Sequence, residues 1–225
     1  MSDSGDHGRR SSPVDVAPLT AASYLDPHYW DERFAAEEHY EWFKDYSHFQ
    51  HLLRPFLNPS HSVLEIGCGN SRLCEELRKD GVADMTCVDI SPVAVERMRS
   101  RFRDKGLEGI KVVQADMLDL PFGSESFDIV IEKGTMDVLF VNSGDPWNPH
   151  PETLNKVMKM LEGVHSVLNP EGIFISISFG QGRRILKSDD CKNERSGVPS
   201  INLLHEELED EDYMFRTTLC DELEN

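Results

Sequence analysis

The apolar residues of this chain change their spacing repeatedly between Ser62 and Phe179. Short apolar runs typical of buried strands are expected at 61–67, 84–90, 110–116, 128–134 and 172–179. Stretches between these runs have helical spacing, as in the series Leu154, Val157, Met158, Leu161, Val164 and Leu168. Ser91 followed by Pro92 predicts the start of another helix. Strands that alternate with helices predict an α/β fold with a doubly wound, mostly parallel sheet.

Three parts of the chain differ in composition. Residues 1–22 hold few large apolar side chains and are expected to be a disordered tail. Residues 23–186 are expected to form one domain, which opens with an aromatic-rich stretch of helical spacing at 24–56. Residues 187–225 are strongly acidic and are expected to be a second, mostly disordered tail.

Charge and composition exclude several classes of function. With 41 acidic and 23 basic residues, the formal net charge of −18 disfavours nucleic acid and favours a basic protein partner. No apolar run approaches the roughly 20 residues that span a bilayer, so no membrane role is expected. The first residues have no secretory or transit pattern, which predicts a cytoplasmic protein. The five cysteines lack zinc-type spacing, so no metal is expected.

The turn after the first predicted strand has the features of a ligand site. In an open α/β sheet, ligands lie beyond the carboxyl ends of the strands. Gly67, Gly69 and Asn70 occupy that turn, where the glycines permit a close approach of backbone to ligand. The N-terminus of the next helix offers free N–H groups to an anion. Glu65, two residues before Gly67, strengthens the assignment.

Acidic residues end the next two predicted strands. Asp89 is placed to accept hydrogen bonds from ribose hydroxyls, and Asp116 to hold an adenine amino group beside the apolar Met117. A dinucleotide site would carry the same acid as Asp89. Arg72, however, stands at the third glycine position of GxGxxG and argues against close pyrophosphate packing. Alternatively, the two aspartates only cap the helices that follow them.

Several segments carry a family resemblance. VLEIGCGN, CVDIS, QADMLDLPF and FDIVIEKGTMD resemble the cofactor motifs of class I S-adenosylmethionine-dependent methyltransferases, which have a Rossmann-like sheet. EKGTMD, together with PHYWDERF and YEWFKDY, is similar to the translation elongation factor 1-alpha lysine methyltransferases and the methyltransferase-like proteins akin to them. The resemblance implies S-adenosyl-L-methionine as cofactor. It also implies protein-lysine N-methylation of a translation elongation factor 1-alpha-like protein.

The resemblance also implies site residues by motif position. Cofactor contacts are implied for Trp30, Phe34, Trp42, Gly67, Asp89, Ile90, Asp116, Met117 and Lys133. Phe34 replaces a tyrosine often found in this family, so a phenol hydrogen bond would be lost while packing remains. Trp30 and Trp42 are equally consistent with ordinary core packing.

Two acidic residues around the loop after the fourth strand are the catalytic candidates. Glu132 and Asp137 are placed to orient an incoming lysine ammonium or to help it lose a proton. Helix capping or a solvated charge explains both residues equally well. EKGTMD stands where base-methylating enzymes carry (D/N)PP(Y/F), which disfavours a nucleic acid base as substrate. A small-molecule methyltransferase remains an alternative.

The end of the chain departs from the family pattern. The sheet of the superfamily ordinarily continues from its fifth strand to an antiparallel pair, whereas no apolar pair is evident after residue 179. The sheet is therefore expected to lack its last two strands, which would expose the edge of strand 172–179. A shortened, weakly active or inactive form that binds cofactor or partners is a further alternative.

Overall fold

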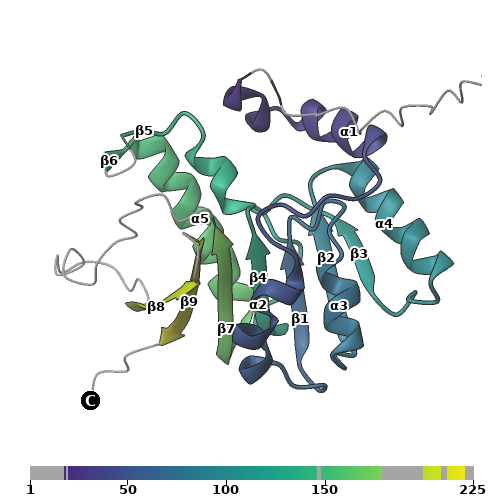
Figure 1. Ribbon diagram of the computed structural model, residues 1–225. Helices are drawn as coiled ribbons and strands as arrows, with labels where there is room; N and C mark the ends of the chain where they lie inside the picture. The colour runs from purple at the N-terminus through teal and green to yellow at the C-terminus, as the bar shows by residue number, and fades with distance from the viewer. Residues whose placement is uncertain (1–17, 19, 146–147, 179–199, 209–211, 221–225) are drawn as a thin grey trace, which may run out of the picture.

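The computed structural model describes residue 18 and residues 20–145, 148–178, 200–208 and 212–220. These residues form a sheet of order β3-β2-β1-β4-β7-β9-β8 with helices on both faces (Figure 1), and a separate hairpin of β5 and β6. The strands are β1 (Ser62–Ile66), β2 (Asp84–Asp89), β3 (Lys111–Gln114), β4 (Phe127–Lys133), β5 (Gly144–Asp145), β6 (Asn148–Pro149), β7 (Leu168–Ser178), β8 (Ser200–Leu208) and β9 (Asp212–Cys220).

The helices of the described residues are η1 (Ala21–Leu25), α1 (Pro27–Ala36), α2 (Tyr46–Leu53), η2 (Arg54–Phe56), α3 (Leu73–Lys79), α4 (Pro92–Asp104), η3 (Met136–Phe140) and α5 (Pro151–Val167). Of these, α3, α4 and α5 lie between strands where helical spacing predicts them, and the other helices precede β1 or follow β4. The predicted start of α4 is confirmed, because the Ser91 hydroxyl accepts a hydrogen bond from the Ala94 N–H at 3.2 Å.

The core lies on both faces of the central strands. Strands β3, β2, β1, β4 and β7 run parallel to one another, and the central strands β1, β2 and β4 have side chains buried on both sides. Val63 packs toward α2, α3 and α4 on one face, and the next residue, Leu64, packs toward α5 and η3 on the other. The predicted α/β fold with a doubly wound, mostly parallel sheet is confirmed.

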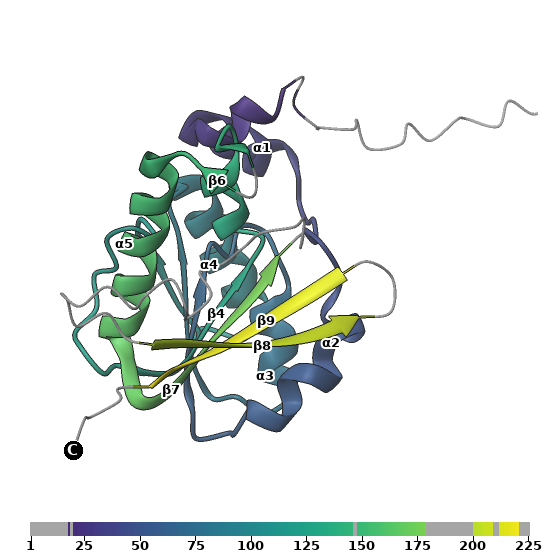
Figure 2. The same cartoon turned by 90° about the vertical axis from the view of Figure 1, so that its left-hand side faces the viewer.

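The expected loss of the last two strands is wrong. Figure 2 shows β9 beside β7 and β8 beyond it; β9 pairs antiparallel with β7 from Ile173↔Thr218 to Ser178↔Tyr213. Strand pairing satisfies the backbone groups of an open edge, so a segment of low apolar content can fill it despite a weak sequence pattern. The expectation of a disordered acidic tail at 187–225 is therefore wrong for β8 and β9, and its other residues lie outside the described ones.

The aromatic-rich lead-in is only partly helical. α2 begins at Tyr46, and the preceding residues 37–45 form no helix, with Phe43 at φ 74°. The predicted N-terminal tail of 1–22 lies largely outside the described residues, although η1 already begins at Ala21. Across the part of the chain that the structure describes, every helix is too short or too polar to cross a bilayer.

Candidate functional site

One cavity opens at the carboxyl ends of β1, β2 and β4, with about 850 Å³ of empty space when its open mouth is included. That size suits a small-molecule ligand. All the residues expected at a cofactor site line it, namely Trp30, Phe34, Trp42, Glu65, Gly67, Gly69, Asn70, Asp89, Ile90, Asp116, Met117 and Lys133. Contact of these residues with a cofactor stays a prediction.

The turn after β1 depends on its two glycines. Gly67 has φ +69°, and a Cβ there would lie 2.1 Å from Oγ1 of Thr135 in the loop after β4. Gly69 has φ +47°, and a Cβ there would lie 3.0 Å from the Phe34 ring. Larger side chains at these positions would meet both backbone strain and steric collision. The turn can therefore lie close to the neighbouring loop and to a ligand.

Asp89 is held firmly at the end of β2. Its carboxylate accepts hydrogen bonds from the Gly69 N–H at 2.8 Å and from the Ser91 N–H at 2.9 Å. Burial raises the pKa of Asp89 above its ordinary value, and these backbone hydrogen bonds oppose the rise. Because a carboxylate has about four lone-pair sites, it can still accept bonds from ligand hydroxyls. The backbone contacts also fit the capping alternative, so both roles remain open.

Asp116 and its neighbours form the β3 side of the cavity. The exposed Asp116 carboxylate accepts a hydrogen bond from the Leu118 N–H at 2.8 Å, which is a local turn contact. Met117 is half-buried and Ile90 is 43% exposed, although both line the cavity. Apolar side chains that remain partly exposed at a cavity leave surface for a flat ligand group.

Aromatic side chains from α1 and residues 37–45 form one wall of the cavity. Trp30 stacks on Phe34 with ring centroids 5.7 Å apart and meets Trp42 edge-on at the same separation. Tyr40, which the sequence analysis did not single out, also lines the cavity and meets Trp42 at 5.3 Å. The aromatic residues thus pack on one another and also face the cavity. Core packing and cofactor contact, the two interpretations of Trp30 and Trp42, are therefore compatible.

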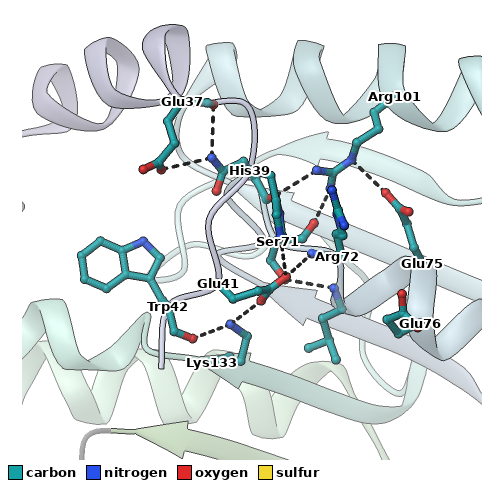
Figure 3. A network of polar contacts seen from close by, with 12 residues as sticks. Glu37, His39, Glu41, Trp42, Ser71, Arg72, Glu75, Glu76, Arg101 and Lys133 are labelled. Atoms are coloured by element: carbon teal, nitrogen blue, oxygen red, sulfur yellow. Dashed lines mark hydrogen bonds and ion pairs between the residues drawn. The ribbon is translucent and has the colours of Figure 1, made fainter. Parts of the chain in front are cut away.

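Residues 37–42, here called the strap, are bound to the turn after β1 by polar contacts (Figure 3). Glu41 accepts a hydrogen bond from the Arg72 N–H at 2.7 Å and pairs with Nζ of Lys133 at 2.9 Å. Nζ of Lys133 also donates to the Trp42 carbonyl at 2.6 Å. One N–H group at the start of α3, that of Arg72, therefore contacts Glu41 rather than a ligand. Sequence analysis missed Glu41, since only its partners identify it.

The two catalytic candidates do not line the cavity. Glu132 is fully buried, and its carboxylate accepts hydrogen bonds from the N–H groups of Thr135 and Met136 at 3.0 Å each and from the Ser176 hydroxyl. Burial, followed by the charge of Asp137, raises the pKa of Glu132 to about 7. Asp137 is half-buried in η3. The contacts of Glu132 are those of the capping alternative, and a catalytic role for either residue stays a prediction.

Glu65 lies at the floor of the cavity among thiols. Burial raises the pKa of Glu65 to about 7, and the Cys74 thiol donates to its carboxylate at 2.8 Å. Glu65, Cys74 and Cys87 place potential metal ligands within 4.8 Å of one another. The Sγ atoms of Cys74 and Cys87, however, are 2.7 Å apart, closer than the roughly 3.8 Å between two sulfur ligands of a tetrahedral zinc ion. The geometry favours hydrogen bonding within this cluster.

Comparison with known families and proteins identifies the domain that contains most of the cavity. A family described as a methyltransferase domain matches residues 57–217. EEF1A lysine methyltransferase 4 of Bos taurus is 40% identical over 171 residues, which cover 75% of this chain and 66% of the relative. The Mus musculus protein of the same name is also 40% identical, over 170 residues covering 74% of this chain and 66% of the relative. The chain thus spans just under two thirds of these relatives.

Solved structures agree at the level of the fold. A SAM dependent methyltransferase from Aquifex aeolicus is 14% identical with a TM-score of 0.56, and the match covers 86% of this chain and 98% of that protein. The PH0226 protein of Pyrococcus horikoshii is 17% identical with a TM-score of 0.56, covering 88% of this chain and 95% of that protein. At such low identity, the likeness concerns the arrangement of strands and helices.

Proposed function

Because this chain belongs to the methyltransferase-domain family, we propose that it transfers a methyl group from S-adenosylmethionine to a lysine side chain of a protein. One observation carries the proposal: a single cavity at the carboxyl edge of the sheet gathers Gly67, Asp89, Asp116 and Lys133. Relatives named for lysine methylation of EEF1A, at 40% identity, support the choice of acceptor.

The residues of the cavity fit this cofactor. Oδ1 of Asn70 and Nε1 of Trp42 are buried without a hydrogen-bond partner among the described residues, and both side chains line the cavity. Buried polar atoms of this kind favour a polar ligand. Asp89 would hold the ribose hydroxyls, and Ile90 and Met117 would pack against the adenine.

Methyl transfer requires mainly that the protein position the methyl donor and the acceptor amine. When bound, S-adenosylmethionine supplies an electrophilic methyl group and a neutral leaving thioether. The protein must exclude water and hold an uncharged amine in line, and such positioning can supply about 7 to 11 kcal/mol. A dry pocket would lower the pKa of the incoming lysine, because burial disfavours the charged form. Glu132 and Asp137 remain candidates to orient that lysine.

We infer that the acceptor is a translation elongation factor 1-alpha-like protein and that the reaction takes place in the cytoplasm. The net charge of −18 favours a basic protein surface over nucleic acid. A small-molecule methyltransferase is the competing interpretation. The alternative of a shortened, inactive form depends on the lack of the last two strands, and β8 and β9 occupy that place in the sheet.

The proposal is tested by incubating the full chain with radiolabelled S-adenosylmethionine and unmethylated elongation factor 1-alpha. We expect a labelled band whose digest contains methyl-lysine, and little label with the Asp89→Ala variant. Glu76→Gln is the matched control, because Glu76 forms a surface ion pair with Lys79 away from the cavity. Label found only in small molecules, or in no lysine, would refute the proposal.

A further inference from the structure

Few of the residues that line the cavity reach its mouth. Among the described residues of that lining, only Tyr40, Ile90 and Asp116 are exposed, and the exposed fractions of Tyr40 and Ile90 are both 43%. Ile90 follows β2 and Asp116 follows β3, whereas Tyr40 belongs to the strap. The mouth thus has a sheet side and a strap side. The proposed function uses the sheet side for the adenine and leaves the strap side without a role.

We propose that the acceptor lysine enters the cavity along Tyr40, and that the Tyr40 ring binds the methylene groups of that lysine. This inference rests on the proposed function and deepens it, because it names the contact that selects a lysine side chain as the acceptor. Tyr40 is then a residue of acceptor specificity and has no part in holding the cofactor.

The strap carries Tyr40 past the turn after β1 and toward the end of β4. Nδ1 of His39 lies 3.2 Å from the carbonyl oxygen of Asn70 in that turn. The Trp42 carbonyl accepts a hydrogen bond from Nζ of Lys133, the last residue of β4, at 2.6 Å. Tyr40 lies in the chain between these two contacts, and β1 separates β4 from β2 in the sheet. An acceptor that passes Tyr40 therefore approaches from the side of the mouth away from the adenine.

A separate approach for the acceptor suits the geometry of the reaction. The amine must attack the methyl group in line with the bond to the leaving sulfur, so it needs a path that the cofactor does not fill. The exposed part of the Tyr40 ring borders such a path, because the residue both lines the cavity and meets solvent.

Neighbouring side chains hold the Tyr40 ring in place. The Arg33 guanidinium lies 4.8 Å from the centroid of the ring, and Trp42 meets the ring edge-on at 5.3 Å. Arg33 is 5% exposed and pairs with the Glu37 carboxylate at 3.2 Å, so its charge is compensated before an ammonium group arrives. A ring that is already fixed loses little conformational entropy when a ligand packs against it. The exposed part of the ring is therefore a preformed contact surface.

A lysine side chain matches this surface better than a short polar amine does. Its four-carbon stem can pack on an aromatic ring while the amine continues into the cavity. The face of the ring also attracts the ammonium group before it loses its proton. A small polar acceptor would gain less from the ring, so Tyr40 should act on the affinity for a protein lysine.

The test compares the KM for the acceptor with the affinity for the cofactor product in variants of the full chain. Methyl transfer is measured with saturating radiolabelled S-adenosylmethionine and increasing unmethylated elongation factor 1-alpha, and calorimetry measures binding of S-adenosylhomocysteine. We expect Tyr40→Ala to raise the KM for the acceptor about fivefold or more and to change the affinity for S-adenosylhomocysteine less than about twofold. Tyr40→Phe should restore the wild-type KM, because the ring and not the hydroxyl makes the contact.

Three further variants serve as controls. Ile90→Ala should show the reverse pattern, with weaker binding of S-adenosylhomocysteine and an unchanged KM for the acceptor. Glu76→Gln should change neither value, because Glu76 pairs with Lys79 away from the cavity. Tyr40→Leu keeps an apolar side chain in the strap and decides the question if Tyr40→Ala does not fold. Its KM for the acceptor should lie above that of Tyr40→Phe.

The outcomes distinguish this inference from the proposed function. Labelled lysine with an unchanged KM in the folded variant that lacks the ring would overturn the role of Tyr40 and leave the proposed function standing. A loss of affinity for S-adenosylhomocysteine in that variant would place Tyr40 with the cofactor and also overturn the inference. A wild-type chain that labels no lysine of the acceptor would refute the proposed function, and the inference with it.

Discussion

Replacing Gly67 with alanine tests how tightly the turn after β1 fits the loop after β4. The added Cβ would lie 2.1 Å from Oγ1, 2.4 Å from Cγ2 and 2.8 Å from Cβ of Thr135. Thr135 would have to move and lose the hydrogen bond that its hydroxyl donates to the Ile66 carbonyl at 3.1 Å. The backbone would also keep φ +69°, a conformation that L side chains rarely adopt.

The magnitude follows from adding these effects. The left-handed backbone costs about 1 to 2 kcal/mol, the lost hydrogen bond about 1 kcal/mol and the overpacking about 1 to 3 kcal/mol. A loss of about 3 kcal/mol or more lowers Tm by roughly 10 °C in a chain of this size. Displacement of the turn should also weaken S-adenosylhomocysteine binding.

Gly106→Ala provides the matched control. Gly106 has φ +67°, and a Cβ there would have nothing within 4 Å, so that variant carries the backbone strain without the collision. Its Tm should fall by roughly 2 to 8 °C, less than for Gly67→Ala. Thermal unfolding by circular dichroism in one buffer measures both variants. Equal losses of Tm would show that Thr135 does not constrain Gly67, and the argument from steric fit would fail.

Three further predictions concern Asp89, Glu132 and Arg33. Asp89→Ala should weaken S-adenosylhomocysteine by about 1 to 3 kcal/mol in calorimetry, because ligand hydroxyls lose their acceptor; unchanged affinity would exclude the ribose assignment. The pKa of Glu132 is about 7 in the fold against 4.5 ordinarily, so its contribution to stability is full below pH 4.5 and is lost as pH rises through 7. The unfolding free energy of the wild type should therefore fall between pH 4.5 and pH 7, and in Glu132→Gln this fall should be smaller by up to roughly 3 kcal/mol. Urea titrations over this pH range measure the difference, and identical pH profiles of the two proteins would contradict the prediction. Arg33→Met should lower Tm by several degrees, because the guanidinium lies 4.8 Å from the Tyr40 ring centroid and 4.7 Å from that of Trp42; an unchanged Tm would remove Arg33 as a support of the strap.

The sequence predicts the central sheet because its signals are local. Apolar runs such as 61–67 and the pair Ser91–Pro92 specify strands and a helix start within a few residues. The placement of β8 and β9 is not local, since it depends on the open edge of β7. A weak pattern in an acidic segment therefore predicts a tail, although the backbone of β8 and β9 pairs regularly.

The residues of the site also divide into those that local sequence signals predict and those that depend on contacts distant in the chain. The turn at Gly67, Asp89 at the end of β2 and Asp116 just after β3 could be predicted as lining one cavity, because the fold brings the carboxyl ends of parallel strands together. Glu41 could not, since its role depends on Arg72 and on Lys133, which is 92 residues distant in the chain. The full burial of Glu132 likewise depends on Ser176 in β7, a contact that no spacing around EKGTMD reveals.

The strap connects the aromatic wall of the cavity with Lys133 at the end of β4. The family match begins at residue 57, whereas Trp30, Phe34, Tyr40 and Trp42 lie before it and line the same cavity. The loops of the sheet within the matched range thus line one part of the cavity, and the preceding segment supplies an aromatic wall. Because the carboxylate of Glu41 and the Trp42 carbonyl both bind Nζ of Lys133, movement of that wall would also move the cation of the sheet. A shift of the strap should therefore change both the binding of the cofactor and the access of the substrate lysine, because it would move the buried ammonium group of Lys133.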